Sequence, residues 1–242
     1  MEGFLLIDKP AGKTSAQCLG RIKFLIQQKG VRVGYAGTLD QFATGLLLVG
    51  IGRPATKLLS LILQLPKTYI GTGRLGILTD TYDSSGAVIC KSDRLVSRLE
   101  LERAMLEFGT GYLQNPPIYS ALKHHGQRLS DLARYHVLSA AELEQISCAK
   151  ARFVQLYALE LCEFNFPEFT IQVRVSAGTY IRALINDVAV RVGSFATTIE
   201  LARTSIGPFS IAEACALDTL NLGLIHERLI SLNTMKKQLS LE

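Results

Sequence analysis

A single carboxylate stands within a run of small residues near the start of the chain. Asp40 lies in segment 34–45, which contains three glycines, Gly34, Gly37 and Gly45. Glycine lets the backbone come close to a bulky ligand, and loops of this kind often carry functional side chains. The other interpretation is that Asp40 only caps a turn, as most aspartates in loops do. Residue types alone leave both interpretations open.

A second candidate is Arg182, which follows the sequence Ser-Ala-Gly-Thr-Tyr-Ile at residues 176–181. The pattern places it in the first turn of a predicted amphipathic helix. A positive charge is unfavourable there, because the N-terminus of a helix already carries partial positive charge. This mismatch indicates that a carboxylate or a phosphate holds the guanidinium. The alternative is an ordinary surface arginine surrounded by water.

Tyr69 is a third candidate, in the sequence Lys-Thr-Tyr at residues 67–69. A tyrosine in a strand commonly packs in the core, but its ring could also stack on a nucleobase or its hydroxyl transfer a proton. The following sequence, Gly71–Gly76, matches GxGxxG literally. Residues 79–86 form turns rather than the helix that a dinucleotide site needs, so we interpret this match as a coincidence. The chain contains no GxxxxGK[ST] phosphate-binding loop.

The composition is that of a globular protein. The 242 residues are 48% hydrophobic and 19% charged, and no apolar run is long enough to span a membrane. The net charge of +5 suggests a polyanionic partner. Five scattered cysteines without a CxxC pair predict buried thiols in a reducing cytoplasm. The four histidines lack metal-ligand spacing, so no metal site is expected.

Local signals predict helices and strands that alternate along the chain. Thr14 and Gln17 have capping-box spacing, as do Ser97 and Glu100, and each pair opens a predicted helix. A further helix is expected between Pro54 and Pro66. The remaining elements of this half are strands at 67–75, 87–90 and 118–123 and a helix at 130–135.

The second half reads as strand, turn and strand over 151–176, followed by a helix that Thr179 caps. An apolar stripe from Ile181 to Val192 marks this helix, and a strand at 196–204 follows it. Residues beyond 212 are expected to be helical. Adjacent strand pairs mixed with helices indicate an α+β fold with a central, mostly antiparallel sheet. Residues 109–138 are a candidate insertion or subdomain.

Seven ordered motifs resemble the TruB family of tRNA pseudouridine synthases. The resemblance covers nearly all of residues 4–210, and the ordered set is far more specific than any single motif. The motifs are Asp8–Ser15, the Gly-Thr-Leu-Asp loop at 37–45, Lys67–Tyr69, Leu75–Asp83, Pro116–Gly126, Gly178–Arg182 and Leu201–Phe209.

The resemblance implies the pseudouridine synthase fold and its chemistry. Such enzymes cut the N1–C1′ bond of a uridine in RNA, turn the base and rejoin it through C5, which needs no cofactor. Asp40 would act beside the ribose, either as a nucleophile at C1′ or as a base on a sugar proton. Arg182 would be its charge partner and favour its ionised form. Tyr69 would stack on the uracil and help to remove the C5 proton.

The resemblance also implies a set of substrate-binding residues. Leu201 would wall the pocket, and Lys9 and Lys67 would support it or contact RNA. Gly37 and Thr38, shortly before Asp40, would also bind the substrate. Two residues depart from the family pattern. They are Tyr35, where an aromatic ring replaces the usual histidine and could keep its stacking role, and Gln41, which replaces the usual proline after the aspartate.

The expected substrate is the T-loop uridine at position 55 of tRNA, flipped out of its stack for reaction. We expect a catalytic domain at 1–210, a short helical extension at 211–242 without the family's C-terminal PUA domain, and a cytoplasmic monomer. A tRNA-folding chaperone without catalysis is the main alternative. An RNA-guided relative fits less well because it depends on the C-terminal domain, and a glycosidase fits less well because it needs two carboxylates.

Overall fold

The computed structural model describes residues 1–28, 30–135 and 137–240, and the chain divides into two compact units. The first unit contains Met1–Tyr69 and the residues from Leu201 onward, and the second contains Ile70–Glu200. The two boundaries fall inside strands β4 (Lys67–Leu75) and β12 (Ala196–Ile206), so both strands run through both units. The first unit is therefore built from the two ends of the sequence.

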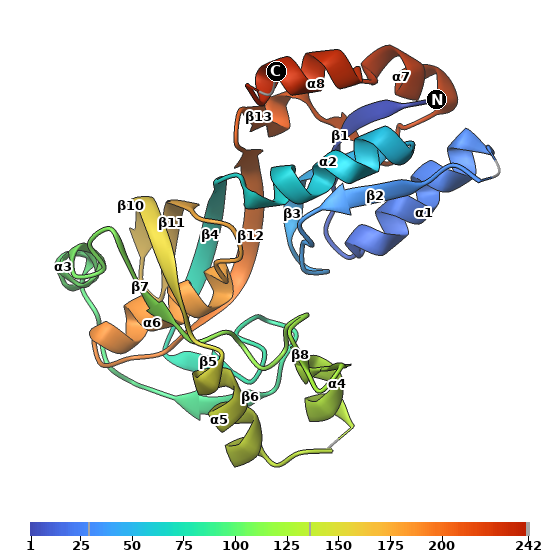
Figure 1. The fold of residues 1–242 in the computed structure, drawn as a ribbon. Helices are drawn as coiled ribbons and strands as arrows, with labels where there is room; N and C mark the ends of the chain where they lie inside the picture. The colour runs from blue at the N-terminus through green and yellow to red at the C-terminus, as the bar shows by residue number, and fades with distance from the viewer. Residues whose placement is uncertain (29, 136, 241–242) are drawn as a thin grey trace. The chain divides into compact units, whose positions relative to one another are not determined.

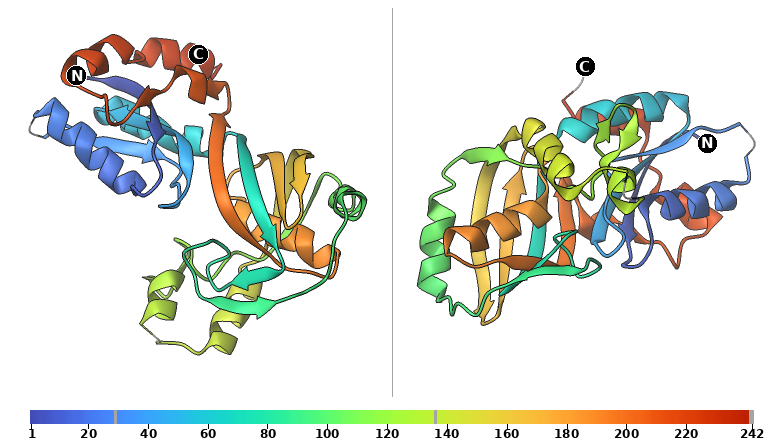
Figure 2. Two further views of the ribbon diagram at one scale, coloured as in Figure 1. Left: turned by 180° about the vertical axis from the view of Figure 1, so that it is seen from behind. Right: turned by 90° about the horizontal axis from the view of Figure 1, so that it is seen from below.

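The first unit is a mixed sheet with helices on both faces (Figures 1 and 2). Its strand order is β14-β1-β3-β12, and β2 also pairs with β3. Strands β1 and β2 run antiparallel to β3, whereas β14 is parallel to β1 and β12 is parallel to β3. The strands and their bounds are β1 (Gly3–Lys9), β2 (Val33–Ala36), β3 (Thr44–Ile51), β13 (Phe209–Ser210) and β14 (Cys215–Ala216).

Alternate side chains of β1 and β3 enter two different hydrophobic clusters. Phe4 and Leu6 belong to the cluster with α2 (Arg53–Gln64) and α8 (Leu232–Gln238). Leu5 and Ile7 belong to the cluster with α1 (Ser15–Ile26) and α7 (Leu222–Arg228). Because both faces are covered, the central residues of these strands are apolar on both sides and lack the alternation of a half-exposed strand. A short 3-10 helix, η1 (Ile211–Glu213), links β13 to β14.

The second unit contains the strand order β4-β11-β10-β7. Strand β10 (Arg152–Asn165) runs antiparallel to both β11 (Glu168–Val175) and β7 (Gly111–Gln114). Four residues of β11, Phe169, Ile171, Val173 and Val175, are buried, and the intervening Gln172 and Arg174 are exposed. The predicted half-buried strand is therefore confirmed.

Helix α6 (Ile181–Arg191) packs on this sheet through a close approach at Gly73 of β4. A Cβ atom at Gly73 would lie 2.6 Å from the Ile185 side chain and 2.8 Å from the Phe169 ring. The glycine is thus needed for packing. Residues 71–75 of the GxGxxG match lie in β4 and β5 (Ile77–Thr79) follows, so the helix that a dinucleotide site needs does not begin there.

The rest of the second unit consists of short elements. The helices are α3 (Arg98–Leu106), α4 (Leu129–Arg134) and α5 (Ala140–Ala149). Two small antiparallel pairs join β5 (Ile77–Thr79) to β6 (Val88–Lys91), and β8 (Lys123–His124) to β9 (Gln127–Arg128). Helices α4 and α5 share a small hydrophobic cluster with Ile118, Tyr119 and Leu122. The proposed subdomain at 109–138 stays a prediction.

Most predicted elements are confirmed, and three expectations are wrong. Capping boxes at Thr14 and Ser97 begin α1 and α3. The strand expected at 118–123 is absent apart from Lys123. The hydroxyl of Thr179 donates to the Ser176 carbonyl 3.0 Å away instead of capping α6. Of the five cysteines, Cys90, Cys148 and Cys162 are exposed.

The predicted C-terminal extension contains α7 and α8, although its last two residues, 241–242, lie outside the described part of the chain. It also contributes β14 and the fully buried Ile225 and Met235 to the first unit. In the described ranges, no helix is long and apolar enough to cross a membrane. The same ranges hold no group of three or more His, Cys, Asp and Glu side chains suited to a metal ion.

Candidate active site

Asp40 lies in a seven-residue loop, residues 37–43, that joins β2 to β3; we call it the aspartate loop. Its carboxylate is half-buried, and the neighbouring Thr38 is exposed. The loop leads directly into Gly45, whose φ is +106°. A Cβ atom there would lie 2.3 Å from the Arg203 carbonyl oxygen of β12, so only glycine fits. The end of the loop is therefore fixed by a close approach of two strands.

Ser15, the first residue of α1, fixes the middle of the aspartate loop. Its buried hydroxyl accepts a hydrogen bond from the Leu39 N–H at 3.0 Å and donates to the Leu39 carbonyl at 3.2 Å. Gln41 and Gly12 form two further bonds: the Gln41 amide donates to the Gly12 carbonyl, and the Gly12 N–H donates to the Gln41 carbonyl. The residues on both sides of Asp40 are thus tied to the segment before α1.

Lys9 brings a fully buried positive charge beneath the loop. Its Nζ donates to the carbonyls of Lys13 at 2.6 Å, Pro10 at 2.9 Å and Gln41 at 3.3 Å. Burial lowers the pKa of this lysine, and the charges of Cys18 and Asp40 oppose that shift. Lys9 therefore supports the loop and lies close enough to Asp40 to interact with its charge.

Arg203 of β12 joins the two stems of the aspartate loop. The side chain is 1% exposed; its Nε donates to the Leu46 carbonyl at 2.8 Å and its Nη2 to the Gly37 carbonyl at 3.0 Å. A planar guanidinium is suited to such divergent contacts. Sequence reasoning included Arg203 in a family motif but gave it no role, because burial of a charged residue is not visible in the sequence.

Lys67 is the first residue of β4, and its side chain lies near Gly37. Its Nζ donates to the carbonyls of Leu63 at 2.8 Å and Leu65 at 2.7 Å, and its side chain is buried. Burial and the nearby Arg203 charge lower its pKa to about 8. Both predicted lysines therefore have their ammonium groups directed at backbone carbonyls of the first unit, which is a supporting role.

The three remaining candidates of the first unit are apolar or aromatic. Tyr69 is 8% exposed and Leu201 is 7% exposed. The Leu201 carbonyl accepts a long hydrogen bond, 3.4 Å, from the hydroxyl of Thr44, the first residue of β3. Tyr35 is half-buried and packs against the cluster that contains α1. Its role in stacking on a base stays a prediction.

Arg182 belongs to the second unit, where it is buried rather than surrounded by water. Its Nη1 pairs with the Asp83 carboxylate at 3.1 Å and also donates to the Thr81 carbonyl, and its Nη2 donates to the Tyr119 carbonyl at 3.0 Å. The side chain is only 5% exposed. The surface alternative is therefore wrong, and a carboxylate does hold the guanidinium. Its expected pairing with Asp40 stays a prediction.

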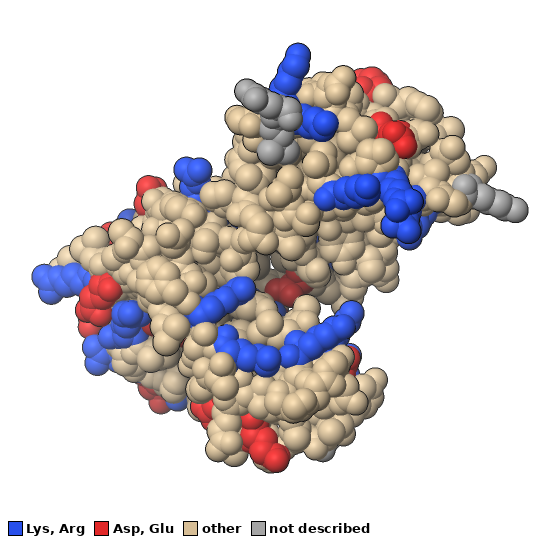
Figure 3. All heavy atoms as spheres, viewed as in Figure 1, with Lys and Arg blue, Asp and Glu red and all other residues tan. Residues whose placement is uncertain are grey.

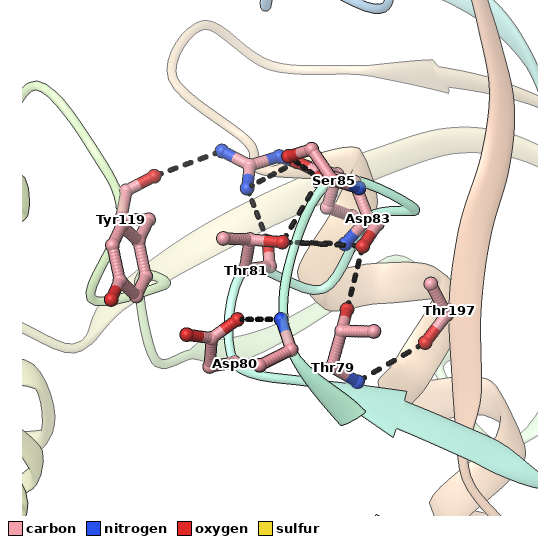
Figure 4. Close-up of polar contacts among 9 residues, drawn as sticks. Thr79, Asp80, Thr81, Asp83, Ser85, Tyr119 and Thr197 are labelled. Carbon is pink, nitrogen blue, oxygen red and sulfur yellow. Dashed lines mark hydrogen bonds and ion pairs between the residues drawn. The ribbon is translucent and has the colours of Figure 1, made fainter. Parts of the chain in front are cut away.

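A tight turn presents Asp83 to Arg182 (Figure 4). One carboxylate oxygen accepts hydrogen bonds from the Thr81 hydroxyl and the Ser85 N–H, both at 2.9 Å, and from the Ser85 hydroxyl. The Thr79 hydroxyl donates to the Asp83 carbonyl at 2.7 Å. The other carboxylate oxygen faces Arg182. The polar residues predicted as a simple turn thus orient Asp83 for a buried ion pair with Arg182. The sequence pattern does not reveal this ion pair.

On the face that Figure 3 shows, basic side chains lie at several separate places. In the second unit, the β8–β9 hairpin and α4 carry exposed Lys123, Arg128 and Arg134. Such a surface suits contacts to phosphates.

Comparison with known proteins connects this arrangement to one family. Residues 23–181 match the profile described as "TruB family pseudouridylate synthase (N terminal domain)". The tRNA pseudouridine synthase B of Francisella tularensis strain WY96-3418 is 37% identical over 238 residues, which are 98% of this chain and 75% of the relative. Mouse pseudouridylate synthase TRUB1 is 37% identical over 228 residues, which are 88% of this chain and 65% of the relative.

Solved structures give the same fold. A Cbf5–Nop10–Gar1 complex contains a chain with 27% identity and a TM-score of 0.67, covering 90% of this chain and 53% of that one. An H/ACA ribonucleoprotein bound to a substrate RNA gives 24% identity and a TM-score of 0.66, covering 97% and 57%. The chain thus spans a little over half the length of these two neighbours.

Proposed function

The chain belongs to the TruB family of pseudouridylate synthases, and we propose that it converts the T-loop uridine at position 55 of tRNA to pseudouridine. The observation that carries the proposal is the aspartate loop, in which Asp40 is half-buried and the nearby Leu39 and Gly37 are held by Ser15 and Arg203. Fixed geometry is what a reaction at one sugar carbon requires. The names of the relatives, tRNA pseudouridine synthase B among them, support tRNA as the substrate.

The proposed reaction is an isomerisation without net oxidation or reduction. The N1–C1′ bond breaks, the uracil turns, C5 forms a new bond to C1′, the proton on C5 leaves, and N1 takes up one proton. Asp40 either attacks C1′ and is later displaced by C5, or removes a sugar proton to give a glycal and returns that proton when C5 bonds to C1′. Both routes require an ionised carboxylate.

Three other residues complete the proposed site. Arg182 is the charge partner of Asp40, as the family resemblance implies. Tyr69 stacks on the uracil and helps to remove the C5 proton, and Leu201 walls the pocket; both side chains are largely buried, so a flipped base would meet a dry surface. Lys9 and Lys67 act indirectly, because their ammonium groups bind backbone carbonyls.

The substrate is proposed to be recognised mainly as a folded stem-loop. A base inside a loop must leave its stack to reach an aspartate, at a cost of about a few kcal/mol that stacking in the pocket offsets. Exposed basic side chains would contact phosphates of the stem without reading the sequence.

The proposal is tested by mapping pseudouridine at single-nucleotide resolution. An unmodified tRNA transcript is incubated with the protein, treated with carbodiimide and copied by reverse transcriptase, which stops one nucleotide before pseudouridine. We expect one new stop, one nucleotide before position 55, and none in a transcript with cytidine at position 55. A stop elsewhere would overturn the assigned site. Binding with no stop anywhere would favour the chaperone alternative.

A further inference from the structure

Gln114 of β7 holds the backbone immediately before α6. Its side chain is buried, and its Oε1 accepts a hydrogen bond from the Tyr180 N–H at 2.8 Å. Its Nε2 donates to the Tyr180 carbonyl at 3.0 Å. One amide side chain therefore binds both backbone groups of a single residue, as a neighbouring strand would. This contact joins residues 66 positions apart in the sequence.

Tyr112 and Asp187 fix which way this amide points. The Tyr112 hydroxyl donates to the Asp187 carboxylate at 2.6 Å, so its oxygen faces Gln114 as an acceptor. The second Nε2 hydrogen of Gln114 occupies that acceptor, also at 2.6 Å. Tyr112 lies two residues before Gln114 on the same face of β7. The oxygen and both N–H groups of the buried amide are thereby used, and the reversed orientation would lose all three hydrogen bonds.

Helix α6 begins without the usual means of fixing a helix start. Tyr180 is its N-cap residue, and the Tyr180 side chain forms no capping hydrogen bond. Arg182 follows two residues later, in the first turn, where its guanidinium reaches Asp83, Thr81 and Tyr119. The position of Tyr180 sets the direction of the first turn of α6. Because the Arg182 side chain is long, a small shift of that backbone moves its guanidinium by a larger distance.

We propose that Gln114 is a positioning residue for the reaction: it binds both backbone groups of Tyr180, the N-cap residue of α6, and so fixes the location of the Arg182 guanidinium. The inference rests on the proposed function, because Arg182 matters for turnover only if it partners the catalytic aspartate. Gln114 itself is not a catalytic residue, since its polar atoms are occupied within the second unit. An error of about 1 Å in a positioned group can lower a rate by about 100-fold.

The test compares Gln114→Met with Gln155→Met, a matched control on the adjacent strand β10. Gln114→Met keeps the length of the side chain but removes all three hydrogen bonds. Gln155 is exposed, and its side chain accepts only the Tyr157 hydroxyl among the contacts described. We expect Gln114→Met to lower the single-turnover rate about 10- to 100-fold with little change in tRNA Kd. Gln155→Met should leave both unchanged.

A second readout follows Arg182 without requiring catalysis. The buried Nε–H of Arg182 should give a resolved arginine signal in a ¹⁵N-¹H spectrum, identified by its absence in Arg182→Lys. We expect Gln114→Met to shift or broaden this signal. If Gln114→Met does not fold, Gln114→Glu keeps the bond from the Tyr180 N–H, and a smaller shift in the same signal is expected. Spectra are taken at pH 8, because the pKa of Asp187, raised by burial to about 6, leaves it ionised there.

The outcomes separate the two proposals. An unchanged Arg182 signal and an unchanged rate in Gln114→Met would overturn the positioning role. A weaker tRNA Kd with an unchanged single-turnover rate would also overturn it. A shifted signal in a protein whose wild type forms no pseudouridine would support positioning by Gln114 and overturn the proposed function.

Discussion

Three buried cations surround the aspartate loop, and each one binds backbone carbonyls. Lys9, Lys67 and Arg203 are at most 4% exposed, and all reach carbonyls within the first unit. Burying a charge is costly unless it is well paired. Here the pairing is with carbonyl dipoles at the ends of the loop and of α2. These hydrogen bonds from buried cations to carbonyls offset the cost of burial and restrain the backbone of the segment that carries Asp40.

Lys67 provides a prediction about pH and stability. Its pKa is lowered by burial from 10.5 to about 8 in the folded protein. Between these values the unfolded chain holds a proton that the folded chain has lost, so the free energy of unfolding should rise with pH from about 8 to 10.5. Below pH 8 the cost of the buried charge is fully present. Lys67→Met should lack this rise.

The measurement is urea unfolding of wild type and Lys67→Met between pH 7 and pH 10. The difference in unfolding free energy, wild type minus variant, should increase as the pH is raised past 8. Two curves that stay parallel over this range would contradict the buried, shifted lysine.

At the scale of elements, the aspartate loop is held by hydrogen bonds from three elements of the first unit. Ser15 at the start of α1, Lys9 at the end of β1 and Arg203 in β12 each reach it from a different element. Asp40 is therefore held by contacts that are distant in sequence. A short connection with so many fixed points can keep a carboxylate oriented before a substrate arrives.

Ser15→Ala tests this support. The change leaves the buried N–H and carbonyl of Leu39 without the hydroxyl, and we expect a loss of about 1–3 kcal/mol in unfolding free energy. We also expect a lower single-turnover rate with little change in tRNA binding. Ser60→Ala, an exposed serine on α2 whose hydroxyl donates to the Lys57 carbonyl, is the matched control. Equal rates for the two variants would show that the loop needs no such support.

Local sequence signals predict many of the helices and strands. The others depend on packing between residues that are distant in the sequence. The capping boxes at Thr14 and Ser97 each fix a helix start from four neighbouring residues. Strand β3 was not predicted, because both its faces are covered and its side chains show no alternation. The segment 118–123 looked like a strand, yet its apolar residues pack against α4 and α5. The apolar pattern of this segment indicates that it is buried, but it does not indicate whether it packs in a sheet or against helices.

In the candidate site, too, local patterns indicate some residues, whereas others are identified only by long-range contacts. Asp40 stands out in the sequence because small residues surround it, and Arg182 because its charge opposes the helix dipole. The partners that hold them, Ser15, Arg203 and Asp83, are brought close only by the fold. Family motifs contained all three, but spacing along the chain did not reveal which atoms would meet.

At the scale of the whole molecule, the two ends of the sequence build one unit and the middle builds the other. The α+β expectation with a mostly antiparallel sheet is confirmed by the strand pairing and by the structural neighbours. Asp40 belongs to the first unit and Arg182 to the second.

The most direct test of the account is tritium release from tRNA transcripts labelled at C5 of uridine. The C5 proton leaves only when the base is rejoined through C5, so release reports the complete isomerisation. We expect wild type to release tritium in proportion to position-55 uridine and Asp40→Asn to release none while still binding tRNA. Release by Asp40→Asn at the wild-type rate, or no release by the wild type, would contradict the central role given to Asp40.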